Sequence, residues 1–407
     1  MQGRRVFWGL IKMSDPSSLQ RIATAHGTVY VAERSQIDQC LPWKQAFANS
    51  RKDRRYYEIV EDTIKQGFEY RYFILEDSAG QVRSIQPAFL LDQDLLQGSG
   101  PRAQRWVGRL RKLFPRALTI RTLMVGCAAG EGHLDQTSDE HAAWTAGALH
   151  EALIQYARAA RVKMIVLKEF PAHYREPLSC FANAGYTRVP SLPFTRLNID
   201  YANFDQYMEK ALSKATRKDL RRKFRDTEAA EPISLEVVSD VTAYVDEIYP
   251  LYLNVYRKSP LQFERLTKEY LCRIGSEMPD KTKFFIWRQN GKAIAFSLCM
   301  IHGDSLYDEY LGLDYDVALD LHLYFYTLRD IVQWSIKQGI KWYCSSALNY
   351  DPKRRLKCEL MPLDLYVTHT SPIANFVLRR VLPLLEPTRN DKCLRDFPNY
   401  DALWGRA

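Results

Sequence analysis

Apolar and polar residues alternate along the first half of the chain in a pattern that predicts a hairpin, a third strand, a helix and further strands. Residues 70–75 and 84–91 are rich in aromatic and aliphatic side chains and flank turn-forming residues at 77–80, which is typical of a β-hairpin. The elements that we expect next are a strand at 119–125, a helix at 140–160, a strand at 162–167, a short helix at 177–184 and a strand at 194–199 that closes this half.

The second half repeats this order of elements. Residues 283–288 and 293–301 flank Asn290-Gly291, a dipeptide that strongly favours a two-residue hairpin turn. After this hairpin we expect a strand at 305–311, a helix at 318–337, a strand at 341–344 and a final strand at 365–369 that completes the second half.

Hairpin, third strand, long helix and strand therefore occur twice along the chain. This order predicts an α/β protein of the α+β type, with two similar domains that are each built on a mixed, mostly antiparallel sheet flanked by helices. The length agrees, because 407 residues exceed the ~250 to 300 at which a single hydrophobic core stops growing.

The net charge of the chain favours anionic partners. The chain has 57 Lys and Arg against 48 Asp and Glu, a formal net charge of +9. Phosphate-bearing cofactors, tRNA and acidic carrier proteins all satisfy this preference, and charge alone does not rank them.

The eight cysteines are widely spread, without a CxxC pair or a Cys/His cluster at metal-binding spacing. This distribution favours reduced core thiols in a cytoplasmic protein and no metal site. No apolar run approaches the ~18 residues that a transmembrane helix needs, so we expect no membrane span.

The most biased segment lies between the two halves. Eight Lys and Arg residues fall between positions 210 and 225 against the single acid Asp219, and Leu212, Leu220 and Phe224 have helical spacing. This pattern predicts a basic helix. It is either a solvated linker between domains or a surface that contacts a phosphate backbone or anionic membrane headgroups.

Five segments of the second half are specific enough to indicate a family: SKATRKDLRRKFR, FFIWRQNGKAIAFSLCM, SLYDEYLGLDYD, LHLYFYTLRDIVQWSIKQGIKWY and NYDPKRRLKCELMPLDLY. Together they resemble the FemAB-like branch of the GNAT superfamily, whose members include peptidoglycan-biosynthesis proteins and acyl-CoA N-acyltransferases. The resemblance is best over residues 205–370. In the first half it rests on the order of elements alone.

The resemblance implies a tandem GNAT fold with one active-site cleft shared by the two domains. Its expected parts are an N-terminal extension packed on the domains (1–55), a first GNAT-like domain (56–203), a basic helical linker (204–230), a second GNAT-like domain (231–390) and a C-terminal tail (391–407).

It also implies an N-acyltransferase that moves an acyl group from a CoA or carrier-protein thioester to an amine of a small-molecule or amino-acid-like acceptor. Relatives use acyl-CoA or aminoacyl-tRNA as donor, so the alternative is a peptide-bond-forming transferase that uses aminoacyl-tRNA. A third hypothesis, from another class, is a non-catalytic GNAT-fold protein that binds nucleic acid or an anionic membrane surface.

Three local matches carry over from the family. Tyr310 and Gly312 stand where the family has Tyr-x-Gly after the third strand, His322 opens the next helix, and Lys353 matches a lysine that follows the next strand. The chain departs from the family at Lys357, where Gly is common, and this puts the local loop geometry in doubt because only Gly freely adopts a positive φ.

Two segments are candidates for holding the donor's phosphates. Residues 126–132 follow a strand and are rich in small residues, so backbone N–H groups near Gly130 and Gly132 are candidates to bind a pyrophosphate; a plain Gly-rich turn is the alternative. The basic run with Lys353, Arg354 and Arg355 is the other candidate, against an exposed basic loop.

Acyl transfer to an amine needs a proton acceptor and donors for the developing oxyanion. Asp308 and Glu309 are candidate bases, and as strand neighbours they point to opposite faces, so at most one lines a cleft. Tyr310 is a candidate to protonate a leaving thiolate and His322 is a candidate base, although a tyrosine on a strand and a histidine at the start of an apolar helix more often have structural roles. The sequence contains no G-x-S-x-G, Walker A or HExxH motif, which argues against hydrolase, kinase and zinc-protease chemistry.

Overall fold

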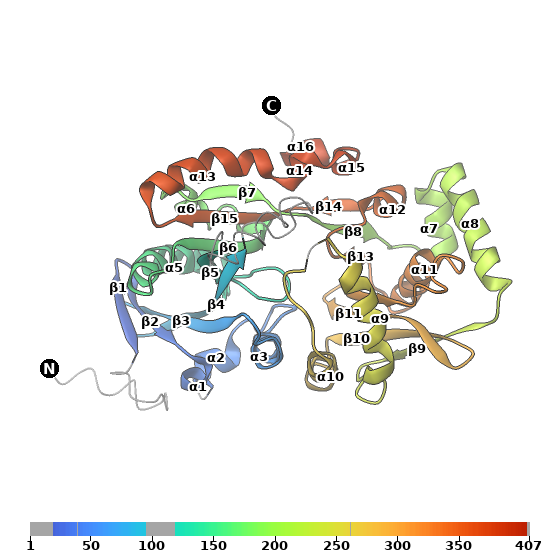
Figure 1. Cartoon of the computed structure of the whole chain (residues 1–407), viewed down its shortest axis with the longest axis horizontal. Coiled ribbons are helices and arrows are strands. Elements are labelled where there is room, and N and C mark those ends of the chain that lie inside the picture. The colour runs from blue at the N-terminus through green and yellow to red at the C-terminus, as the bar shows by residue number, and fades with distance from the viewer. Residues whose placement is uncertain (1–18, 39, 95–118, 261, 405–407) are drawn as a thin grey trace, which may run out of the picture. The chain divides into compact units, whose positions relative to one another are not determined.

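The chain forms two compact units in a computed structural model that describes residues 19–38, 40–94, 119–260 and 262–404. Unit 1 comprises the described residues within 1–191 and 363–386, and unit 2 those within 192–362 and 387–407. The backbone therefore enters unit 2, returns to unit 1 for one strand and one helix, and ends in unit 2 (Figure 1).

Unit 1 is built on an eight-stranded sheet of order β1-β2-β3-β4-β5-β6-β15-β7. β5 and β6 are parallel, and the other neighbours are antiparallel. The elements of this unit are β1 (Gln20–Thr24), β2 (Gly27–Ala32), α1 (Arg34–Ile37), α2 (Leu41–Gln45), α3 (Arg54–Thr63), β3 (Glu69–Asp77), β4 (Val82–Asp94), β5 (Thr119–Val125), α5 (Asp139–Ala159), β6 (Met164–Pro171), the 3₁₀ turn η3 (Ala172–Tyr174), α6 (Ser179–Asn183), β7 (Thr187–Pro190), β15 (Leu363–His369) and α13 (Pro372–Leu385).

Unit 2 is built on a seven-stranded sheet of order β14-β8-β13-β12-β11-β10-β9. β12 and β13 are parallel, and the other neighbours are antiparallel. The elements of this unit are β8 (Phe194–Asn198), α7 (Phe204–Ala211), α8 (Lys214–Glu228), β9 (Ile233–Val238), α9 (Val245–Lys258), α10 (Lys268–Glu277), β10 (Thr282–Gln289), β11 (Lys292–His302), β12 (Ser305–Leu313), α11 (Leu323–Lys337), β13 (Trp342–Ser345), α12 (Tyr350–Arg355), β14 (Glu359–Met361), α14 (Pro387–Asn390), α15 (Lys392–Arg395) and α16 (Tyr400–Trp404).

The predicted repeat is confirmed. In unit 1 the β3–β4 hairpin is followed by β5, α5 and β6, and in unit 2 the β10–β11 hairpin is followed by β12, α11 and β13. In both units the third strand and the strand after the long helix form the parallel pair. The protein thus has two mixed, mostly antiparallel sheets with helices, as the order of elements predicts.

The last strand of each half belongs to the other unit, which corrects the expectation that each half closes on its own strand. β8 pairs with β13 and β14 in the second sheet, and β15 pairs with β6 and β7 in the first. Figure 1 shows this exchange by colour, with red β15 beside green β7 and blue-green β6. Residues 1–55, expected as an extension, also supply two strands of the first sheet, β1 and β2.

Local sequence explains where several elements begin and turn. Asn290 and Gly291 have φ values of 52° and 77°, which are the positive angles of the hairpin turn that the dipeptide predicts. The side chain of Ser138 accepts a hydrogen bond from the backbone N–H of His141 at 3.2 Å and caps α5. α11 begins at Leu323 and not at 318, because His322 has a left-handed backbone (φ 47°) that interrupts the helix.

Candidate functional site

The parallel strands of unit 2 separate after a short stretch of pairing. β12 pairs with β13 from Ser305 to Asp308 only, and β12 then continues to Leu313 paired with β11 alone. At the same point the register between β11 and β12 shifts, so that Glu309 is an extra residue in β12. The edge of β12 beyond Asp308 is therefore not paired with β13.

The bulge at Glu309 changes which side chains share a face of β12. Without it, Asp308, Tyr310 and Gly312 would all point the same way. In the structure the side chain of Asp308 contacts Tyr343 of the hydrophobic core. Gly312 instead faces α9, because a Cβ at this position would lie 2.8 Å from the backbone nitrogen of Tyr252. Asp308 and Tyr310 consequently belong to different surroundings, although only one residue separates them.

The carboxylate of Asp308 is held by two hydroxyl groups. Ser297 Oγ in β11 donates a hydrogen bond to Oδ1 at 2.5 Å, and the Tyr343 hydroxyl in β13 donates one to Oδ2 at 2.7 Å. Burial raises the pKa of Asp308 above its ordinary value, while the two hydroxyl donors and the positive charge of Lys353 oppose this rise in part. A raised pKa makes this carboxylate a stronger proton acceptor than an ordinary exposed aspartate.

Lys353 of α12 is a buried cation near Asp308. Its side chain is 5% exposed, and its Nζ donates a hydrogen bond to the Ser346 carbonyl at 2.5 Å. Burial lowers the pKa of Lys353 to about 8, although Cys358 and Asp308 raise it in part. A buried ammonium group is costly without such compensation, so its position indicates a role beyond solubility.

Lys357, the departure from the family pattern, has the backbone geometry that a glycine would adopt. Its φ is 64°, its N–H bonds to the Arg354 carbonyl at 3.0 Å, and the Cys358 N–H bonds to the Lys353 carbonyl at 3.0 Å. These two bonds form a Schellman motif that ends α12. The loop geometry is thus retained despite the lysine.

The loop between β13 and α12 has an unusual backbone. Leu348 and Asn349 both have left-handed φ values, 73° and 51°. Such residues each cost about 1 to 3 kcal/mol and are concentrated at functional sites. Two tyrosines near this loop, Tyr324 and Tyr343, have pKa values raised by burial and by the Asp308 charge, so both remain protonated hydrogen-bond donors.

The other residues predicted for catalysis lie elsewhere in unit 2. The Tyr310 hydroxyl donates a hydrogen bond to Glu264 Oε1 at 2.9 Å, and its ring contacts the rings of Tyr252 and Tyr270. His322 Nε2 lies 3.8 Å from Asp226 of α8. Glu309 is partly buried at the bulge.

The two arginines predicted to bind phosphate pair with an acidic side chain of their own helix. Arg354 and Arg355 each lie 2.9 Å from an oxygen of Asp351 in α12, and Arg354 also lies 3.8 Å from Asp396. Both ion pairs are at the surface, where a phosphate group can compete with Asp351.

The Gly-rich loop of unit 1 is tightly packed. A Cβ at Gly130 would collide with Lys52 Nζ, and a Cβ at Gly132 would lie 2.5 Å from the Lys168 carbonyl oxygen. Between them the buried Glu131 forms ion pairs with Arg51 and, at 2.6 Å, with Lys52. Burial alone would raise the pKa of Glu131, but the two cations hold it well below its ordinary range. The side chains of this chain thus already fill the space beside the loop.

Sequence reasoning missed Ser297 and Tyr343 at the unit 2 site and Arg51 and Lys52 in unit 1. No motif marks these residues, because each reaches its partner through strand pairing or long-range packing. Asp308 pairs with Cys299 of β11 and Ser345 of β13, each two residues from one of its hydroxyl partners. This pairing would have pointed to Ser297 and Tyr343, but it can be used only when the register of the strands is known.

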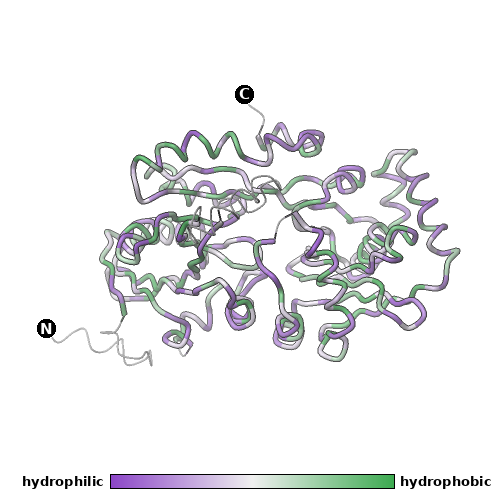
Figure 2. The backbone as a smooth tube through the Cα atoms, viewed as in Figure 1, coloured by the Kyte–Doolittle hydropathy of each residue, from purple (hydrophilic) through white to green (hydrophobic). Residues whose placement is uncertain are grey.

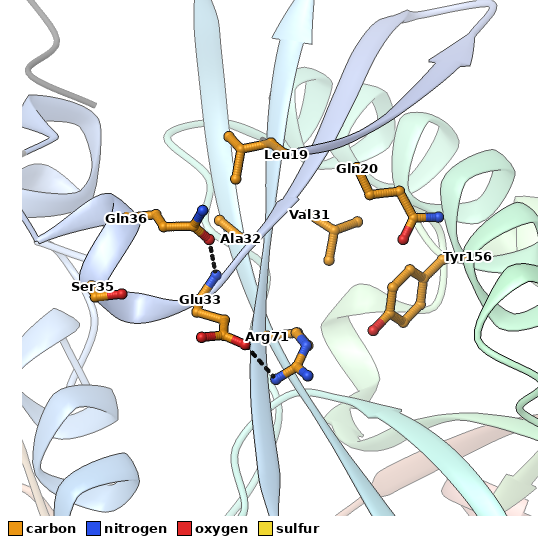
Figure 3. Close-up of a pocket in the computed structure, with 9 residues that line it drawn as sticks. All are labelled: Leu19, Gln20, Val31, Ala32, Glu33, Ser35, Gln36, Arg71 and Tyr156. Carbon is orange, nitrogen blue, oxygen red and sulfur yellow. Dashed lines mark hydrogen bonds and ion pairs between the residues drawn. The ribbon is translucent and has the colours of Figure 1, made fainter. Parts of the chain in front are cut away.

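An open pocket of about 740 Å³ lies at the edge of the first sheet (Figure 3). Glu33 and Arg71 face each other there at 3.7 Å, and Tyr156 and Val31 line the opposite side. None of the residues predicted for the site lines this pocket.

All eight cysteines lie in the described part of the chain, and none forms a disulfide. Within residues 19–38, 40–94, 119–260 and 262–404, no group of three or more His, Cys, Asp or Glu side chains has metal-binding geometry. No helix among the described residues is both long and apolar enough to cross a membrane.

The comparison with protein families matches residues 128–349, more than half of the chain, to the model of FemAB-like proteins, described as peptidoglycan biosynthesis/recognition. The chain belongs to the FemAB-like family. The matched region of this family member contains α5 and β6 of the unit 1 repeat and the whole unit 2 repeat, from the β10–β11 hairpin to β13. No curated protein matches the chain significantly.

Several solved structures resemble this FemAB-like chain at low sequence identity. The structure of FemX is 10% identical, with 76% of this chain and 90% of that chain covered and a TM-score of 0.47. L-PGS from Bacillus licheniformis is 12% identical, with 80% and 95% covered and a TM-score of 0.46. A tandem GNAT protein from the clavulanic acid biosynthesis pathway is 11% identical, with 77% and 87% covered and a TM-score of 0.42.

Proposed function

We propose that this FemAB-like protein is an enzyme that transfers an acyl group to an amine, and that the reaction takes place where β12 and β13 separate. The observation that carries the proposal is the edge of β12 that is no longer paired with β13, directly after the Asp308 carboxylate. An extended ligand that contains amide groups can pair with such an edge as an added strand does. The pantetheine arm of coenzyme A has this chemistry.

In this proposal Asp308 accepts the proton that the amine loses. The amine nitrogen attacks the acyl carbon, the bond between this carbon and the thioester sulfur breaks, and the leaving thiolate takes the proton that Asp308 accepted, which restores the carboxylate. The raised pKa of Asp308 makes the carboxylate a better proton acceptor, and a positioned base of this kind contributes roughly 10² to 10⁴ in rate. No covalent intermediate with the protein is needed, because positioning alone supplies up to ~7 to 11 kcal/mol.

The neighbouring groups stabilise negative charge. Lys353 provides a positive charge in a buried setting, where its field is stronger than in water. Tyr324 and Tyr343 provide hydroxyl donors. Backbone N–H groups of β12 beyond the bulge are candidates to hold the carbonyl oxygen of the donor. In this scheme Glu309, Tyr310 and His322 have supporting roles.

A CoA thioester is the proposed donor, with Arg354 and Arg355 near its phosphates and an amine of a small-molecule or amino-acid-like molecule as the acceptor. An acyl carrier protein presents the same pantetheine arm and is the related alternative. The position of Gly130 and Gly132 beside buried side chains favours α12 over the Gly-rich loop as the phosphate contact.

Aminoacyl-tRNA is the second candidate donor, and α8 is the observation that favours it. Leu220 and Phe224 anchor this helix in the core, while its outer side exposes five cations: Lys214, Lys218, Arg221, Arg222 and Arg225. A row of exposed cations on one helix is suited to a nucleic-acid backbone.

A thermal-shift panel separates the two donors. A ligand at 100 times its dissociation constant stabilises the fold by roughly 2.7 kcal/mol, which is readily measured. We expect a CoA thioester to raise Tm and the shift to survive ribonuclease treatment. If aminoacyl-tRNA stabilises the protein and CoA thioesters do not, the second donor is correct. If neither stabilises it and Asp308→Asn leaves the biological function intact, the protein is a non-catalytic binding protein.

A further inference from the structure

Helix α13 in unit 1 exposes an apolar surface. Of the nine large hydrophobic side chains that are exposed in the described part of the chain, six lie on this helix. None of its residues is buried. Figure 2 shows hydrophobic colouring along much of α13. The exposed fractions of the six are 80% for Ile373, 57% for Phe376, 52% for Val377, 39% for Val381, 63% for Leu384 and 67% for Leu385.

An ordinary surface helix turns its apolar side to the core, whereas α13 also carries apolar side chains on its exposed side. Its inner side is fixed by the polar residue Asn375. Asn375 Oδ1 accepts a hydrogen bond from the His369 N–H of β15, and Asn375 Nδ2 donates one to the Gly185 carbonyl, both at 3.1 Å. The helix lies along β7 and β15 (Figure 1), and these two bonds hold its apolar side away from the sheet.

The charged residues within α13 are positive, and the acidic Glu386 follows the helix as its C-cap. α13 contains Arg379 and Arg380 and no acidic residue. Arg380 lies over the ring of Phe376, with its guanidinium carbon 3.5 Å from the ring centre. Arg161 and Lys163 are exposed beside the start of the helix, where the Lys163 carbonyl accepts a hydrogen bond from the Thr370 N–H at 2.8 Å.

We propose that the exposed side of α13 binds the surface of an anionic lipid bilayer. The helix is ~21 Å long, a length at which it can lie in the plane of the headgroups with its apolar side chains among the acyl chains. The arginines extend to the lipid phosphates, as long basic side chains do at membrane surfaces. Charge complementarity favours this occupant over a second copy of the chain, because a symmetric contact would bring the same arginines together. The inference does not depend on acyl transfer.

Vesicle flotation with the full-length protein tests this proposal. The probes are vesicles of phosphatidylcholine alone and vesicles of equal parts phosphatidylcholine and phosphatidylglycerol, at low and high salt. We expect binding to the anionic vesicles that weakens as salt rises. The triple variant Ile373→Ser/Phe376→Ser/Leu384→Ser should lose at least about tenfold in affinity for these vesicles, because it removes the side chains that insert.

Leu319→Ser is the matched control, because Leu319 is also 80% exposed but lies in unit 2. This variant should bind vesicles as the wild type does. A second test keeps the apolar side intact: Arg379→Gln/Arg380→Gln should weaken binding to anionic vesicles about fivefold per arginine. The second test decides the matter if the triple variant does not fold.

Three results would overturn the proposal: no flotation of the wild type with anionic vesicles, equal flotation of the wild type and the triple serine variant, or equal binding to neutral and anionic vesicles. A fourth is a wild-type dimer that the triple variant converts to a monomer in the absence of vesicle binding. That result would assign the surface to a second copy of the chain.

Discussion

The Tyr343 hydroxyl of β13 donates a hydrogen bond at 2.7 Å to Oδ2 of Asp308, which is the last residue of β12 that pairs with β13. The bond places a carboxylate at the point where the pairing of β12 with β13 ends. It also makes the protonation state of Asp308 dependent on a residue of the neighbouring strand.

Replacement of the carboxylate is expected to abolish most of the acyl transfer. Asp308→Asn keeps the shape of the side chain but cannot accept a proton, so the rate should fall about 10²- to 10⁴-fold. The rate of thiol release from a CoA thioester with a panel of amines measures this effect. Asp304→Asn, in the exposed turn before β12, is the control. Full activity of Asp308→Asn would exclude Asp308 as the base.

Removal of the Tyr343 hydroxyl is expected to shift the pH dependence. The hydroxyl lowers the pKa of Asp308, so Tyr343→Phe should raise this pKa further. Because the base acts in its ionised form, activity is lost as pH falls through the pKa of Asp308. The acid limb of the kcat/KM profile should therefore move up by about one pH unit in the variant. Tyr350→Phe, which removes a hydroxyl bonded to the Pro193 carbonyl, should leave the profile unchanged.

The burial of Lys353 is expected to make stability depend on pH. Its pKa in the folded protein is about 8, below the value of roughly 10.4 for an unfolded chain, so the unfolded state binds more protons between these values. The free energy of unfolding should thus rise with pH across this window, by up to roughly 3 kcal/mol. Lys353→Met should lack this rise in urea unfolding, whereas Lys337→Met, at an exposed position, should retain it. Parallel pH dependence of the wild type and Lys353→Met would contradict the assignment.

A glycine at position 357 is expected to stabilise the protein. Lys357 has a φ of 64°, and this backbone conformation costs a residue with a side chain roughly 1 to 2 kcal/mol in the folded state. Glycine has no such cost, but the larger conformational entropy of glycine in the unfolded chain offsets part of the gain. Lys357→Gly should therefore raise the free energy of unfolding by about 0.5 to 1 kcal/mol. Lys357→Ala keeps the strain and should be nearly neutral. A gain in stability with alanine would show that the lysine charge, and not the backbone, is responsible.

Because β15 belongs to the sheet of unit 1, a substitution in this late strand is expected to lower the stability of unit 1. Tyr366 of β15 is 1% exposed in the core of unit 1, and its replacement by alanine should cost about 3 to 5 kcal/mol. Limited proteolysis should then cut Tyr366→Ala first within unit 1. Leu360→Ala, in β14 of unit 2, should lead to cleavage within unit 2. Cleavage of both variants at the same sites would contradict this expectation.

The sequence predicts the repeated elements because their signals are local. The Asn290-Gly291 turn, the helical spacing of α5 and the apolar runs of the strands depend on neighbouring residues only. The exchange of β8 and β15 is not visible in the sequence. Strand partners far apart in the chain are chosen by packing, and each of the two strands could pair in either sheet as far as its own pattern shows.

At the candidate site the sequence locates Asp308 and Lys353 but not their surroundings. Asp308 could be identified as a carboxylate on a strand, whereas its hydroxyl partners Ser297 and Tyr343 depend on the register of three strands. The bulge at Glu309 has no marker such as glycine, so the sequence could not show that Asp308 and Tyr310 have different surroundings.

Hydrogen exchange of the backbone amides of β12, with and without a saturating CoA thioester, tests the central claim most directly. If the donor binds along the edge of β12 that β13 leaves after Asp308, exchange in the segment from Glu309 to Leu313 should slow on binding, while β10, which is paired on both sides, should not change. Unchanged exchange in this segment at saturation would contradict the proposed site.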